Sequence, residues 1–194
     1  MERSLYLAFE ALDYVRKNIK PCNTRTRSLP GYATPRSNPA ISERDIGEIR
    51  DRARRFGRVG GSKLLGRLDL GRLAISRGVG NCAEMACAAG FFLYYHRGYY
   101  AFDVVTICGQ DHDLIVTGTT GPQQYPARFE LWPPHLAICD AWADIACLGQ
   151  DYPARWEERM RNWHRTGIHI CSGGAWLDAM ECRDVATYPV RSRL

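Results

Sequence analysis

The chain has 194 residues, of which 45% are hydrophobic and 24% are charged, and its formal net charge is +5. This composition is typical of one globular domain with a sizeable core, and it excludes collagen-like, coiled-coil and wholly disordered chains. The N-terminus carries an early acidic residue and no sustained apolar run, and no stretch approaches the length of a membrane span. We therefore expect neither a conventional signal peptide nor a membrane partner.

Much of the positive surplus lies between Arg50 and Arg72. Such a segment can bind nucleic acid or an acidic protein, or it can be the solvated face of a helix. Only Phe56 interrupts the basic residues with an aromatic ring, which favours the solvated face and argues against nucleic acid. A non-catalytic binding module with a basic surface is the alternative from another functional class.

Eight cysteines are scattered along the chain, at Cys22, Cys82, Cys87, Cys108, Cys139, Cys147, Cys171 and Cys182. Several lie inside apolar runs, as buried thiols do, and no pair has the C-x-x-C spacing of a structural zinc site. This usage predicts free thiols in a reducing compartment, with no metal and no cofactor.

The first sixty residues predict helices joined by an irregular segment. Apolar residues recur at helical spacing over 4–20, at Leu5, Phe9, Leu12, Val15 and Ile19. Proline and polar residues over 21–39 predict a linker or surface loop. A second helix is expected after a capping box at Ser42 and Asp45, with inward-facing residues at Ile46, Ile49, Ala53 and Phe56. We assign residues 1–60 to an N-terminal helical region, within or beside a domain over 61–194.

The rest of the chain predicts a buried helix followed by strands. A short helix is expected over 64–75 and an alanine-rich helix over 82–96. Runs rich in β-branched and apolar residues predict strands over 102–108, 112–118, 136–139 and 168–171, and a charged helix is expected over 152–164. Helices first and strands afterwards indicate an α+β fold with an antiparallel sheet.

Cys82 stands where the glycine-bearing loop of residues 80–81 meets the alanine-rich helix. At a helix N-terminus, unpaired backbone N–H groups and the helix dipole favour the nucleophilic thiolate. A small buried cysteine that opens a core helix is the other interpretation of Cys82 taken alone. The choice between them depends on whether the chain supplies a base.

A base and an orienting carboxylate follow at His112, which begins a predicted strand, and Asp140, which ends another. Thiol catalysis needs an imidazole to take the proton and a carboxylate or amide to hold the ring. Asp144 is the nearest competitor of Asp140. Cys87 lies beyond the first helical turn and should pack in the core, and Asp113 should point to the opposite face of the strand from His112.

Three blocks, at residues 80–86, 111–112 and 139–143, together resemble those of papain-like/transglutaminase-like cysteine enzymes, above all the secreted effector and toxin domains of bacteria. The resemblance implies a papain-like core in which a nucleophile-bearing helix packs on the sheet. It also implies Cys82 as nucleophile, His112 as base and Asp140 as orienter. Activities in this group are cysteine proteolysis, deamidation of a glutamine in a target protein, and transglutamination.

The remaining roles follow from this chemistry. An oxyanion hole requires N–H donors, for which the backbone of Cys82 and Asn81 or the preceding loop are candidates. Glu84 and Trp142 are supporting residues, the first at the helix start and the second packed on the aspartate loop. We expect a monomeric, thiol-dependent hydrolase of protein substrates in the cytosol of a target cell or of its own cell. The resemblance favours glutamine deamidation through a thioester over proteolysis.

Overall fold

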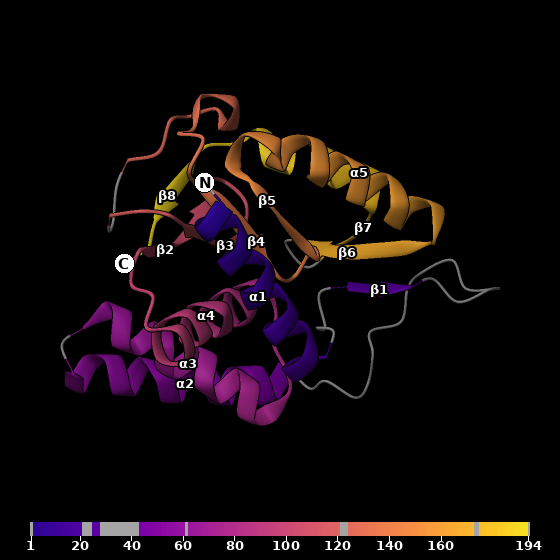
Figure 1. Ribbon diagram of the computed structural model, residues 1–194. Coiled ribbons are helices and arrows are strands. Elements are labelled where there is room, and N and C mark those ends of the chain that lie inside the picture. Colours follow the sequence, from indigo (N-terminus) through magenta and orange to yellow (C-terminus); the bar gives the residue numbers. More distant parts are fainter. Residues whose placement is uncertain are drawn as a thin grey trace.

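The computed structural model describes residues 2–20, 25–27, 43–60, 62–120, 124–172 and 175–193 (Figure 1). The α-helices are α1 (Glu2–Asn18), α2 (Glu43–Gly60), α3 (Lys63–Arg77), α4 (Cys82–Phe91) and α5 (Tyr152–Arg165). The strands are β1 (Arg25–Arg27), β2 (Phe102–Ile107), β3 (His112–Thr117), β4 (Ala137–Asp140), β5 (Ile145–Leu148), β6 (Ile168–Ser172), β7 (Ala175–Asp178) and β8 (Val190–Ser192). A π-helical segment, η1 (Phe92–His96), and the 3-10 helices η2 (Phe129–Leu131), η3 (Gly149–Asp151) and η4 (Ala179–Thr187) complete the described elements.

The centre of the molecule is an antiparallel five-stranded sheet with the order β5-β4-β3-β2-β8, and a second, three-stranded sheet has the order β1-β6-β7. Every residue of β2, β3 and β4 is buried. Side chains alternate between the two faces of a strand, and Val116 is paired with Ile138. His112 on β3 and Asp140 on β4 therefore share one face of the central sheet.

The opposite face of the central sheet packs against helices. Gly90 of α4 lies close to Phe102 and Ile115, because a Cβ there would stand 3.2 and 3.5 Å from those side chains. The Thr117 hydroxyl donates to the backbone carbonyl of Ser4 on α1 at 2.9 Å. Helices α3 and α2 stack in turn outside α4, at the lower side of Figure 1. The nucleophile candidate Cys82 thus begins a helix enclosed between the sheet and α3.

The α+β class is confirmed, but the packing of α1 differs from the predicted stripe. Val15 and Ile19 are buried as expected, whereas Phe9 is 50% exposed. Ala8 and Ala11 are fully buried instead, because small side chains let the helix backbone approach the sheet closely. Hydrophobicity alone therefore misplaced the inner face of α1 by about one position.

Several observed helices and strands differ in length from the predicted ones, and four observed strands were not predicted. Helix α3 extends over 15 residues, and the helix over 82–96 ends at Phe91 and continues as the π-helical η1. Strands β1, β5, β7 and β8, each of three or four residues, were not predicted. Most of the predicted linker over 21–39, the cap at Ser42 and the side chain of Phe56 lie outside the described residues.

One hydrophobic core contains residues from Leu7 on α1 to Val190 on β8. It includes Ala53 on α2, so the N-terminal helices and the sheet bury side chains together. The boundary at residue 60 stays a prediction. Among the helices of the described segments, none is both long and apolar enough to cross a membrane.

Candidate active site

His112 and Asp140 form a hydrogen-bonded pair at one end of the central sheet. His112 is the first residue of β3 and Asp140 is the last of β4, and these ends meet because the strands are antiparallel neighbours. His112 Nε2 lies 2.8 Å from Asp140 Oδ2. The histidine is 6% exposed and the aspartate is fully buried. The structure therefore joins two of the three predicted site residues directly.

Two more donors hold the Asp140 carboxylate. The Tyr152 hydroxyl donates to Oδ2 at 2.8 Å, and the backbone N–H of Ala143 donates to Oδ1 at 3.0 Å. Tyr152 is fully buried at the start of α5. Sequence reasoning missed its role because it placed Tyr152 only at the beginning of a helix, and no local pattern links a helix start to a carboxylate on a strand.

The environment favours the charged forms of both partners. Burial alone would lower the pKa of His112, but the charge and hydrogen bond of Asp140, together with hydrogen bonding and charge from Cys82, raise it to about 10. Burial would raise the pKa of Asp140, but the charge and hydrogen bond of His112 and the donors Ala143 and Tyr152 lower it. An imidazolium–carboxylate pair is therefore the favoured state at neutral pH.

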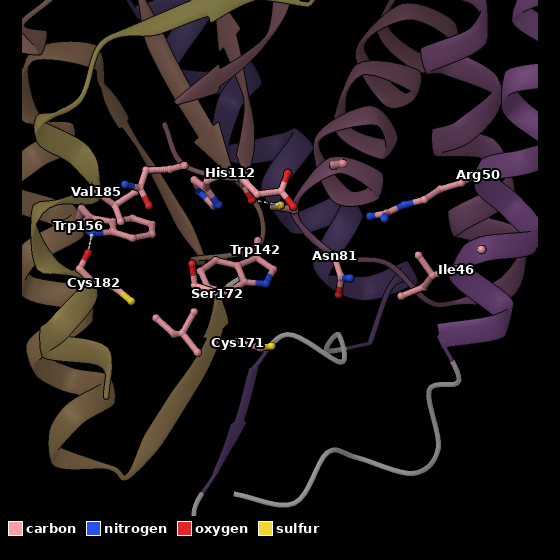
Figure 2. Close-up of a pocket in the computed structure, with 16 residues that line it drawn as sticks. Ile46, Arg50, Asn81, His112, Trp142, Trp156, Cys171, Ser172, Cys182 and Val185 are labelled. Atoms are coloured by element: carbon pink, nitrogen blue, oxygen red, sulfur yellow. Dashed lines mark hydrogen bonds between the residues drawn. The ribbon is translucent and has the colours of Figure 1, made fainter. Parts of the chain in front are cut away.

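Cys82 is the first residue of α4 and lines the same cavity as His112. Its thiol donates to the backbone carbonyl of Asp111 at 3.3 Å, drawn as a dashed line in Figure 2. Since Nε2 of His112 is bound to Asp140, the ring nitrogen left for the thiol is Nδ1. As the first helical residue, Cys82 also has a backbone N–H without an acceptor inside the helix, which suits an oxyanion donor.

The loop that carries Cys82 is held by a buried carboxylate. Glu84 is fully buried and accepts the backbone N–H of Asn81 at 2.9 Å. The backbone N–H of Asn81 is thus committed, so only its side chain, which lines the cavity, suits the oxyanion role predicted for this residue. Arg50 of α2 binds Glu84 through two bonds, Nε–Oε1 at 2.6 Å and Nη2–Oε2 at 3.2 Å. Sequence reasoning placed Arg50 only within a basic segment.

The cavity has a volume of about 360 Å³ and lies between the helices and the α5 side of the molecule (Figure 2). Arg50, Asn81 and Cys82 line its helical side. Trp142 and Trp156 line the other side, with ring centroids 5.3 and 5.1 Å from that of His112. Trp142 is 5% exposed, so it packs against His112 and also lines the cavity. Trp156 was not predicted as part of the site.

The competing residues lie elsewhere. Cys87 is fully buried, and burial raises the pKa of its thiol to about 12. Asp144 has a left-handed backbone (φ 61°) and pairs with Arg159 at 3.4 Å, away from His112. Asp113 points to the other sheet face, where Arg67 of α3 lies 3.6 Å away. Of the predicted site residues, Cys82 and His112 therefore line the cavity together, and Asp140 lies buried behind His112 and is hydrogen-bonded to it.

The cysteines within the described residues, from Cys82 to Cys182, are all free thiols. The described segments contain no cluster of three or more histidine, cysteine or acidic residues that suits a metal ion. Comparison of the chain with protein-family models, with curated proteins and with solved structures finds no match.

Proposed function

We propose that this protein is a thiol-dependent amide hydrolase in which Cys82 is the nucleophile, His112 the general base and Asp140 the residue that orients the imidazole. The observation that carries the proposal is the buried His112–Asp140 hydrogen bond of 2.8 Å beside a cavity that Cys82 also lines. A nucleophile, a base and a group that holds the base are the parts that covalent amide hydrolysis needs.

The first half-reaction forms a thioester. In the reacting state Cys82 has left the Asp111 carbonyl and its proton resides on His112 Nδ1, as part of the imidazolium that Asp140 stabilises. The Cys82 thiolate then attacks the amide carbon of the substrate. The backbone N–H of Cys82 and the side chain of Asn81 donate to the oxyanion. When the tetrahedral intermediate collapses, the C–N bond breaks and His112 returns the proton to the nitrogen, which leaves as ammonia or an amine.

The second half-reaction consumes water. His112 takes a proton from a water molecule, and the hydroxide attacks the thioester carbon. The C–S bond breaks, the proton returns to the sulfur, and a carboxylic acid is released. Asp140 stays ionised throughout and stabilises the imidazolium, with Tyr152 and Ala143 fixing its two oxygens.

Within this class we favour deamidation of a glutamine side chain in a target protein by a bacterial effector or toxin. The resemblance of the three sequence blocks to such domains supports this choice. The position of Cys82 at the start of α4, which packs on an antiparallel sheet carrying His112 and Asp140, supports a papain-like core. Proteolysis and transglutamination use the same thioester and differ in leaving group or acceptor.

Thiol reactivity tests the nucleophile without knowledge of the substrate. We expect iodoacetamide at neutral pH to alkylate Cys82 faster than the partly exposed Cys108 and Cys171, as measured by peptide mass spectrometry. His112→Ala should slow alkylation of Cys82 at least about ten-fold. His164→Ala is the matched control, because His164 forms a second histidine–aspartate pair with Asp178, 2.9 Å away and outside the cavity.

Equal alkylation rates for Cys82 and Cys108, or an unchanged rate in His112→Ala, would reject the enzyme and favour the binding module. The reaction type is decided by incubating candidate target proteins with the wild type and with Cys82→Ala. A glutamine converted to glutamate in an intact chain, only with the wild type, supports deamidation. Cleaved chains or cross-linked products would contradict it and identify a protease or a transglutaminase.

A further inference from the structure

Arg50 lines the cavity, and the proposed mechanism gives it no role. It comes from α2, whose Ile46 and Gly47 also line the cavity. The other described arginines of this helix with ion pairs, Arg44 and Arg54, bind carboxylates of the same helix at the surface. Arg50 instead binds Glu84 on α4, and Figure 2 shows its guanidinium extending from α2 toward the centre of the site.

Glu84 creates an electrostatic problem at this position. Its carboxylate is fully buried two residues after Cys82, and it holds the loop by accepting the Asn81 N–H. A buried negative charge beside a thiol opposes loss of the thiol proton. The carboxylate of Glu84 therefore has two opposing effects. It holds the loop through the Asn81 N–H, but its negative charge, if left uncompensated, would repel a thiolate at Cys82.

The guanidinium of Arg50 removes this conflict. Its two bonds to Glu84, at 2.6 and 3.2 Å, have the paired geometry in which an arginine and a carboxylate bind most strongly. The hydrogen bond and charge of Glu84 raise the pKa of Arg50, and Cys82 and Asp111 also interact with its charge. Arg50 and Cys82 also line the same cavity, so the positive charge of the guanidinium lies on the side of Glu84 where the nucleophile is.

We propose that Arg50 is a positioning residue for the nucleophile: its positive charge neutralises Glu84, keeps the Cys82 loop in place and stabilises the Cys82 thiolate. This inference rests on the proposed function, because it assumes that Cys82 reacts as a thiolate. It adds a residue from α2, which the three sequence blocks do not contain. Helix α2 then becomes part of the active site as well as one of its walls.

The other charged and titratable groups near Cys82 set the background against which Arg50 acts. His112 on β3, with Asp140 and Tyr152 behind it, supplies the imidazolium, and Asp111 supplies a carboxylate in the preceding turn. Cys171 on β6 and Cys182 on η4 are thiols on the same cavity, and burial raises the pKa of Cys182. Substituting Arg50 or Glu84 leaves all of these groups in place.

The test is the pH dependence of Cys82 alkylation in a set of charge variants. Arg50→Gln leaves the charge of Glu84 uncompensated and should move the midpoint of the rate–pH profile upward by about one pH unit. At a pH below the midpoint, Cys82 of this variant should then be alkylated about ten-fold more slowly than that of the wild type. Glu84→Gln leaves the positive charge alone and should move the midpoint downward. The double variant removes both charges and should return the midpoint toward that of the wild type. Arg54→Gln, on the same helix and paired at the surface, should change nothing.

A purely structural ion pair predicts a different pattern. The single and double variants would then lose thermal stability to a similar degree with no change of midpoint, and that result would overturn the inference. Should Arg50→Gln fail to fold, the comparison of Glu84→Gln with the double variant still decides, because those two proteins differ only in the charge of Arg50 and equal midpoints would overturn the inference. If Cys82 is alkylated equally fast in the wild type and in His112→Ala, the proposed function itself is rejected. Failure of the inference about Arg50 can therefore be distinguished from failure of the proposed function.

Discussion

At the residue scale, the candidate site depends on how a few buried polar atoms satisfy one another. Asp140 has no exposed surface, yet each of its oxygens accepts at least one hydrogen bond, from His112 and Tyr152 on one side and Ala143 on the other. Buried carboxylates are tolerated only when they are paired in this way. The same holds for Glu84 with Asn81 and Arg50.

The pair of His112 and Asp140 predicts a pH dependence of stability. The folded-state pKa of His112 is about 10, above the ordinary value of 6.5, so its stabilising contribution is fully present below pH 6.5 and is lost as the pH rises toward 10. We expect the free energy of unfolding of the wild type to fall between pH 6.5 and 10 by about 2 kcal/mol more than that of His112→Gln. Urea titration at a series of pH values under reducing conditions measures this difference. His164→Gln, at an exposed pair, should keep the wild-type slope. Parallel curves for the wild type and His112→Gln would contradict the assignment.

At the element scale, α4 is positioned by close backbone contact as well as by side chains. Gly71 on α3 faces the backbone of α4, where an added Cβ would lie 2.2 Å from the carbonyl oxygen of Cys87. Only a residue without a side chain lets the two helices approach so closely. Because α4 begins at Cys82, the spacing between α3 and α4 also sets the position of the thiol.

Substitution of this glycine should therefore separate the helices. We expect Gly71→Ala to lower the free energy of unfolding by about 2 kcal/mol and the melting temperature by roughly 4–8 °C. Gly47→Ala on α2 is the matched control. Among the described residues, no atom lies within 4 Å of the Cβ that it adds, so the higher helix propensity of alanine should stabilise the protein by up to about 1 kcal/mol. Equal effects of both substitutions on thermal unfolding would refute the close contact.

At the scale of the whole molecule, the shared core links the N-terminal helices to the sheet. Ala11 on α1 is fully buried, and α1 packs against β3, β4 and β5. All five tryptophans, by contrast, lie in the C-terminal part of the chain, from Trp132 onward. Tryptophan fluorescence therefore reports unfolding of the sheet side without a signal from α1.

This arrangement predicts one cooperative unfolding transition for both parts. Ala11→Glu places a charge in the core and should lower the melting temperature followed by tryptophan fluorescence and by far-ultraviolet circular dichroism by the same amount, about 5 °C or more. Phe9→Gln, at a half-exposed position on the same helix, should shift it far less. If Ala11→Glu leaves the melting temperature measured by tryptophan fluorescence unchanged, residues 1–60 form a separate domain.

Hydrophobic periodicity is a local property of about ten residues, so the α+β class, most helices and the longer strands could be predicted from sequence alone. It also placed Cys82 at a helix start, His112 at the beginning of a strand and Asp140 at the end of another. Because β3 and β4 are antiparallel neighbours in the sheet, the start of β3 and the end of β4 meet, and this brings His112 and Asp140 into contact. The short strands β7 and β8 escaped detection because polar residues cut their apolar runs short, whereas a longer unbroken apolar run covers most of the similarly short β4.

The other side chains at the candidate site could not be predicted, because they come from elements far apart in the sequence. Tyr152 meets Asp140 across 12 positions and Arg50 meets Glu84 across 34, and neither pairing has a signature in local sequence. Trp156 contacts His112 because α5 folds back over the end of the sheet. These contacts depend on the register of the strands and on how closely the helices pack, which are fixed by the whole core at once.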